Sequence, residues 1–143
     1  MKQTVLTKIL NCALVLLGFA STTSCEHIGQ IACEYGTPTM DFKVSGKVVS
    51  QDSAPIAGIK VSCHVFTAPG IVTAHTAADG SFSISGTGMS PLLEFEDIDG
   101  PENGGEFAGK TEEIKVNKVK EGDGHWYRGE YEANDVVIRL ERK

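Results

Sequence analysis

The sequence lacks an apolar segment long enough to cross a bilayer as a helix. Its longest apolar run, Ile9–Ala20, has twelve residues, whereas a spanning helix needs about 20. It also lacks an excess of basic charge, since 13 Lys and Arg stand against 19 Asp and Glu. Binding to nucleic-acid phosphates needs a basic face, so a nucleic-acid partner is excluded. With 143 residues, the chain has room for one domain.

Arrangements that support nucleophilic or metal-assisted catalysis are also missing from the sequence. It contains no Gly-x-Ser-x-Gly nucleophile elbow and no three-cysteine motif for an iron–sulfur cluster. We therefore expect that the protein is not an enzyme. The alternative, a small envelope hydrolase, requires a polar cleft with a convergent acid–base pair. The four histidines, which show no paired metal-ligand spacing, are His27, His64, His75 and His125.

The apolar run is typical of a secretory signal peptide, because Lys2 and Lys8 give it a basic start and small residues follow it. The segment Ala20–Cys25 resembles the lipobox of bacterial lipoproteins. This resemblance implies that residues 1–24 are removed and that Cys25 carries fatty acyl chains such as palmitate. Such chains would hold the exported protein on the cell membrane or the outer membrane. The alternative is an ordinary signal peptide followed by an unmodified cysteine.

Residues 25–40 show no apolar periodicity, and we expect them to form a tether between the lipid and a domain at residues 41–143. If Cys25 is lipidated, Cys33 and Cys63 are the only pair left to form a disulfide in an exported compartment. Cys63 lies on the apolar side of an alternating segment. A buried free thiol is therefore the alternative.

From Asp41 on, apolar and polar residues alternate in short segments that are separated by turn signals. Alternation with period two predicts half-buried strands. Their number and spacing predict an all-β fold, a single antiparallel Greek-key β-sandwich of about seven strands. The predicted strands lie at residues 42–49, 59–66, 71–76, 81–85, 92–98, 114–116 and 135–141.

Three segments in the first half of this domain carry a family resemblance. Val44–Val49 is followed by Pro55–Val61, and then by Thr73–Ile84, which contains an Asp-Gly hairpin turn and the aromatic Phe82. This order resembles the transthyretin-like domains that are related to carboxypeptidase regulatory domains. The resemblance implies the same β-sandwich fold.

The chain from about residue 33 on resembles a narrower group, the radical-SAM-associated lipoproteins. That resemblance implies a small exported lipoprotein whose gene lies near a radical SAM enzyme, and it implies no established activity. A radical SAM enzyme is therefore one candidate partner, with this chain as its accessory protein or its maturation substrate. The segments that carry the resemblance are Cys33–Thr39, Glu94–Gly100, Asn103–Phe107 and Trp126–Tyr127 followed by Gly129.

The densest charge of the chain is a run of carboxylates in a glycine-rich loop, residues 94–106, with no basic residue among them. Calcium takes about six to eight oxygen ligands and favours such loops. We therefore predict a Ca²⁺ site here, and the alternatives are a solvated loop or a surface for a protein partner. The predicted ligands are Asp97, Asp99, Asn103 and Glu106.

Three aromatic residues, Trp126, Tyr127 and Tyr131, are interleaved with polar residues and glycine. Exposed aromatic side chains are typical of surfaces that bind carbohydrate or protein. The alternative is that they anchor the core at one end of the sandwich. The sequence as a whole predicts a non-catalytic, membrane-anchored lipoprotein of the cell envelope. We expect it to act as a binding or accessory module for an envelope protein or glycan.

Overall fold

Eight β-strands form the folded unit Gly36–Lys143 of the computed structural model, which describes residues 8–9 and 36–143. Each strand from the second to the fifth begins after a turn that the sequence marks with glycine, proline, aspartate or serine. The strands are β1 Thr39–Ser50, β2 Ile59–His64, β3 Ile71–His75, β4 Ser81–Gly88, β5 Leu92–Asp97, β6 Lys110–Glu113, β7 Asn117–Glu121 and β8 Tyr127–Leu140.

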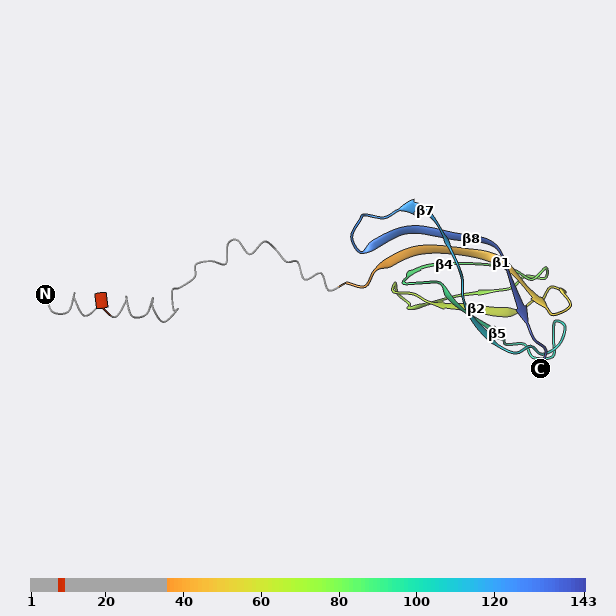
Figure 1. Ribbon diagram of the computed structural model, residues 1–143. Helices are drawn as coiled ribbons and strands as arrows, with labels where there is room; N and C mark the ends of the chain where they lie inside the picture. The colour runs from red at the N-terminus through yellow and green to blue at the C-terminus, as the bar shows by residue number, and fades with distance from the viewer. Residues whose placement is uncertain (1–7, 10–35) are drawn as a thin grey trace. The chain divides into compact units, whose positions relative to one another are not determined.

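These strands make two four-stranded sheets that pack face to face (Figure 1). One sheet has the strand order β4-β1-β8-β7 and the other has the order β3-β2-β5-β6. The predicted all-β sandwich is thereby confirmed. The pairing differs from the prediction in one respect, since β1 and β8 run parallel while the other neighbours run antiparallel. Parallel neighbours need a long crossover, and here the whole second sheet supplies it.

The first five predicted strands correspond to β1 through β5, and the later ones differ. The sixth strand lies at Lys110–Glu113, before the predicted residues 114–116, and β7 was not predicted at all. Both β6 and β7 are edge strands with almost every residue exposed. An edge strand without a buried face shows no alternation of apolar and polar residues, and the sequence pattern therefore misses it. The last strand begins at Tyr127, well before the predicted residue 135.

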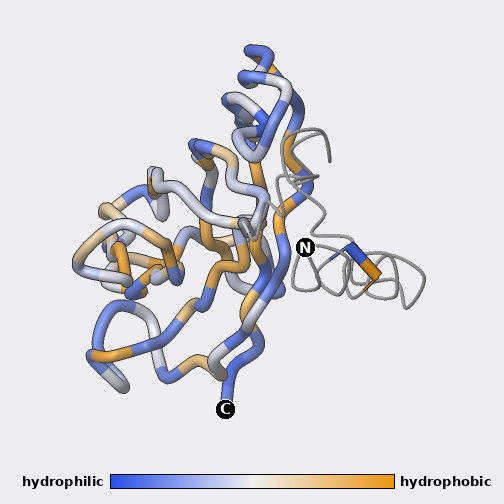
Figure 2. Tube along the Cα trace, turned by 90° about the vertical axis from the view of Figure 1, so that its left-hand side faces the viewer, coloured by the Kyte–Doolittle hydropathy of each residue, from blue (hydrophilic) through white to orange (hydrophobic). Residues whose placement is uncertain are grey.

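The apolar residues of the alternating strands meet between the two sheets. Val44, Ile59 and Leu93 are fully buried there, and Figure 2 shows apolar and polar stretches alternating along the strands. The rings of Phe82 and Phe95 pack edge to face, with 5.6 Å between their centroids. A shift of one residue in any of these strands would expose its apolar side, so this core determines the register.

The connecting loops gather at two opposite ends of the sandwich. We call the end where β1 begins the proximal end, and it holds the loops at residues 65–70, 89–91 and 122–126. The amide of Phe66 donates to the carbonyl of Thr87 at 2.8 Å, which joins the two sheets at this end. The other end, which holds the last residues of the chain (Figure 1), is the distal end. Its loops are residues 51–58, 76–80 and 98–109.

Beside the bulge in the β1–β8 pair, the backbones approach so closely that there is no room for a side chain at Gly46. A Cβ atom there would clash with the carbonyl group of Val136. We expect Gly46→Ala to lower the free energy of unfolding by about 3 kcal/mol, because the strands would have to separate. Urea unfolding measures this. Gly88→Ala is the matched control, since its Cβ would meet no atom closer than 3.6 Å. Equal losses in both variants would contradict the prediction.

Candidate functional site

The acidic loop starts where β5 ends, and the carboxylate of Asp97 holds its two ends together. One oxygen of Asp97 accepts hydrogen bonds from the amides of Asp99, at 3.2 Å, and Gly100, at 3.1 Å. The other oxygen accepts the amide of Phe107 at 2.8 Å. The loop therefore has a defined conformation, which is built around one half-buried carboxylate.

These hydrogen bonds keep Asp97 ionised. Burial alone raises the pKa of a carboxyl group, because it disfavours the charged form. At Asp97 the opposing hydrogen bonds, from Phe107 first and then from Asp99 and Gly100, lower the pKa below its ordinary value. Oriented backbone amides thus stabilise the negative charge at the base of the loop.

The far side of the loop is held by the last residues of the chain. Phe107 is buried and pairs with Arg142 in a short antiparallel bridge. The guanidinium carbon of Arg142 lies 5.8 Å from the centroid of the Phe107 ring. Glu106 accepts a hydrogen bond from the Lys143 ammonium group at 2.8 Å, and its carbonyl accepts the amide of Lys143 at 3.0 Å. The sequence showed no sign of this contact, which joins residues 37 positions apart.

The four predicted calcium ligands lie in this loop, and each of them is engaged with the protein itself. Asp97 binds backbone amides, Asp99 accepts the side-chain amide of Asn103, and Glu106 pairs with Lys143. Across residues 36–143, no group of three or more His, Cys, Asp or Glu side chains is arranged to hold a metal ion. Calcium binding by the loop stays a prediction.

A groove of about 430 Å³ runs beside β5 and β6 at the base of the loop. Its lining includes the acidic residues Glu94 and Glu96 and the basic residues Lys110 and Lys143. Lys110 is paired with Glu112 at 2.7 Å. This mixture of charges suits contacts with polar groups of a partner rather than burial of an apolar ligand.

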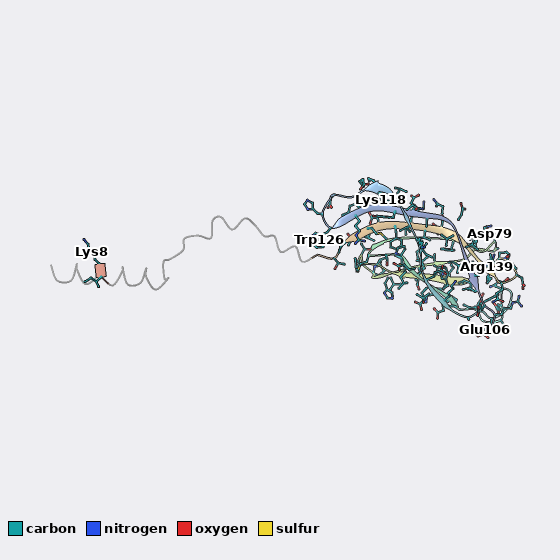
Figure 3. All side chains as sticks on the ribbon, viewed as in Figure 1. Lys8, Asp79, Glu106, Lys118, Trp126 and Arg139 are labelled. Atoms are coloured by element: carbon teal, nitrogen blue, oxygen red, sulfur yellow. The ribbon has the colours of Figure 1, made fainter. Side chains whose placement is uncertain are left out.

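The predicted aromatic surface lies at the opposite, proximal end, where Figure 3 labels Trp126. The indole of Trp126 is half-buried, and a Cβ atom at Gly36 would lie 2.9 Å from it. The carbonyl of Trp126 accepts the amide of Thr39 at 2.8 Å. Trp126 thus packs on the first residues of the domain, which agrees with the core-anchor alternative.

The two tyrosines of this segment are also bound to neighbouring strands. The Tyr127 hydroxyl donates to the carboxylate of Asp41 at 2.8 Å. This hydrogen bond, together with desolvation and the charge of Asp41, raises the pKa of Tyr127 to about 12. The ammonium of Lys118 lies 5.7 Å from the centroid of the Tyr131 ring. Sequence reasoning missed Asp41, because its partner lies 86 residues away.

The cysteine predictions fall mostly outside the described residues. Cys63 is buried and forms no disulfide with any described residue. Burial raises the pKa of its thiol, against the smaller lowering effect of a hydrogen bond from the backbone at Leu92. Cys25 and Cys33 lie outside the described residues, so the lipid attachment and the Cys33–Cys63 disulfide stay predictions. Within the described ranges, no helix has the length and apolar character that a membrane span requires.

No family model matches the chain, and no curated protein matches it. Among the solved structures that are similar to it are two of low sequence identity. One is the dioxygenase domain of a dioxygenase carbohydrate-binding protein fusion from Streptomyces sp. SirexAA-E, 15% identical with a TM-score of 0.45, covering 76% of this chain and 84% of that one. The other is 3-chlorocatechol 1,2-dioxygenase from Rhodococcus opacus 1CP, 12% identical with a TM-score of 0.42. That match covers 78% of this chain and 62% of the dioxygenase.

These neighbours correct one expectation from the sequence. Both are dioxygenases by name, which contradicts the prediction that the protein is not an enzyme, and we withdraw that prediction. Sandwich folds of this kind carry enzymes as well as binding modules, and a fold does not determine a function. At TM-scores of 0.45 and 0.42, the likeness supports no particular activity for this chain.

The role of Asp97 in the loop is testable. We expect Asp97→Asn to lower the free energy of unfolding at pH 7 by about 2 kcal/mol, because charged hydrogen bonds to three amides are weakened. A lowered pKa means that this stabilisation is present above the ordinary carboxyl pKa and is lost as the pH falls below about 4. Chemical unfolding at pH 7 and pH 3 measures both effects.

Glu94→Gln is the matched control for this measurement, since Glu94 is exposed on the same strand. We expect its stability to stay within about 0.5 kcal/mol of the wild type. If Asp97→Asn lowers the free energy of unfolding by the same amount at pH 3 and at pH 7, the ionised carboxylate of Asp97 does not stabilise the loop, and the prediction is wrong.

Proposed function

We propose that the protein is a lipoprotein of the bacterial cell envelope that is anchored through acylated Cys25. Its single β-sandwich domain serves as a binding module. The observation that carries this proposal is the division of the chain. The folded unit begins at Gly36, and ten residues, 26–35, separate it from Cys25. A signal peptide, a lipidated cysteine and a short tether account for residues 1–35.

We place the partner surface at the distal end of the domain. The loops 51–58, 76–80 and 98–109 carry five carboxylates and no Lys or Arg of their own. Lys47 and Lys143 pair with Asp79 and Glu106, which leaves Asp52, Asp99 and Glu102 without a salt bridge among the described residues. A concentration of one sign of charge attracts partners of the other sign and speeds their association. Asp97 also fixes the conformation of the longest of these loops, which lowers the entropic cost of binding. An envelope protein with a basic surface is the partner that this end fits.

The anchor is tested by fractionation and mass spectrometry of the full chain expressed in bacterial cells. We expect the wild type to sediment with membranes and to carry acyl chains on Cys25, and we expect Cys25→Ser to lose both properties. Cys63→Ser is the matched control, since Cys63 is a buried thiol of the domain and its loss leaves the anchor in place. A wild-type chain without acyl groups at Cys25 would refute the proposal.

The partner surface is tested by a photo-crosslinking amino acid placed at Glu102 in the full chain in intact cells. We expect several-fold more crosslinked product from this position than from Val119, a control on β7 that is 55% exposed. The yield should fall as salt rises, because exposed charges are screened over about 10 Å at 0.1 M ionic strength. Equal products from both positions, or none from Glu102, would contradict a distal partner surface.

A further inference from the structure

Two proximal loops expose large apolar side chains and contain no ionisable residue. In the loop between β2 and β3, Phe66 is 57% exposed, and Met89 between β4 and β5 is 56% exposed. Ile71 and Leu92 begin the strands that follow these loops, and they are 44% and 51% exposed. Isolated apolar residues on a protein surface are ordinary, whereas a contiguous group marks a site of interaction.

These four side chains belong to one end of the sandwich and to adjacent elements. The amide of Phe66 donates to the carbonyl of Thr87, and β4 then leads directly into Met89. Ile71 is the register partner of the exposed His64 at the end of β2, and β2 lies between β3 and β5, so His64 separates Ile71 from Leu92. On the other side of β2, Leu93 pairs with Cys63, which places Leu92 at the same end.

The position of the proposed lipid anchor indicates what covers this surface. The domain begins at Gly36, and its first strand starts at the proximal end. The ten residues between Cys25 and Gly36 span at most about 3.5 Å each when fully extended. An acylated Cys25 therefore keeps the proximal end within about 40 Å of the bilayer surface.

Charge favours the same orientation. Of the five carboxylates of the distal loops, Asp79 and Glu106 pair with Lys47 and Lys143. Asp52, Asp99 and Glu102 form no salt bridge within the described residues, and an anionic lipid surface repels these three charges. The loops that hold Phe66 and Met89 carry no charge, and they can approach headgroups without desolvating an ion. The third proximal loop differs from these two, because it carries Asp123 and its Trp126 packs on Gly36.

We infer that the proximal end of the domain rests on the lipid bilayer, with Phe66 and Met89 inserted at the boundary between headgroups and acyl chains. This inference rests on the proposed lipid anchor and adds a second contact, which is made by the folded domain itself. It gives the domain a fixed orientation, in which the acidic distal end points away from the membrane.

The test uses single-tryptophan reporters in the full acylated chain, reconstituted in phosphatidylcholine vesicles with brominated acyl chains. Phe66→Trp with Trp126→Phe reports on the proximal loop. The control is Ile98→Trp with Trp126→Phe, since Ile98 is 55% exposed at the distal end. Interfacial side chains lie about 5–10 Å into the boundary, so we expect bromine to remove about half of the fluorescence at position 66. Position 98 should be unaffected.

A second measurement uses the unaltered chain, in case a reporter fails to fold. Hydrogen exchange of the amides at residues 65–70 and 89–91 should slow on vesicles, while that of residues 98–109 stays the same. If the chain sediments with vesicles but position 66 is not quenched and the proximal amides are not protected, the inference is wrong and the anchor stands. If the wild-type chain is not acylated, the proposed function fails and the inference fails with it.

Discussion

The parallel pairing of β1 with β8 connects the first and last strands of the domain, and the placement of both ends follows from it. The two strands run side by side from Thr39 and Tyr127 to Ser50 and Leu140. Their common start brings the β7–β8 loop to the proximal end, where Trp126 covers Gly36. Their common direction brings the last residues of the chain to the distal end, where they hold the acidic loop. A contact of such sequence separation is costly to form, because loop-closure entropy is lost before the contact is made.

The strands that bury one face were predictable from the sequence, and those that bury none were not. Alternation marks which side of β1 through β5 faces the core, and the fully buried Val44, Val61 and Phe95 fall on that side. Alternation does not say which strand is the neighbour of which. The parallel β1–β8 pair therefore had no signal in the sequence. The edge strand β7 consists of exposed residues only, and its pairing with β8 is visible only in three dimensions.

The sequence predicted where the acidic loop lies, but it did not predict what its carboxylates bind. A run of carboxylates among glycines is expected both for a cation site and for a loop that binds its own backbone, because both need oxygen acceptors in a turning chain. The structure shows the second use at Asp97, whose partner Phe107 lies ten residues further on. The aromatic segment offered the same ambiguity. Whether Tyr127 is free to bind a partner depends on Asp41, which accepts the hydrogen bond of its hydroxyl group. Asp41 lies on β1, far from Tyr127 in the sequence.

The alternating direction of successive strands sorts the connecting loops between the two ends of the sandwich. Each strand from β1 to β6 reverses the direction of the one before it, so that successive loops fall at alternate ends of the sandwich. The loops at 51–58, 76–80 and 98–109 contain acidic residues, and the intervening loops at 65–70 and 89–91 contain none. Charge that alternates from loop to loop thus places three acid-containing loops at the distal end and the two uncharged loops, 65–70 and 89–91, at the proximal end.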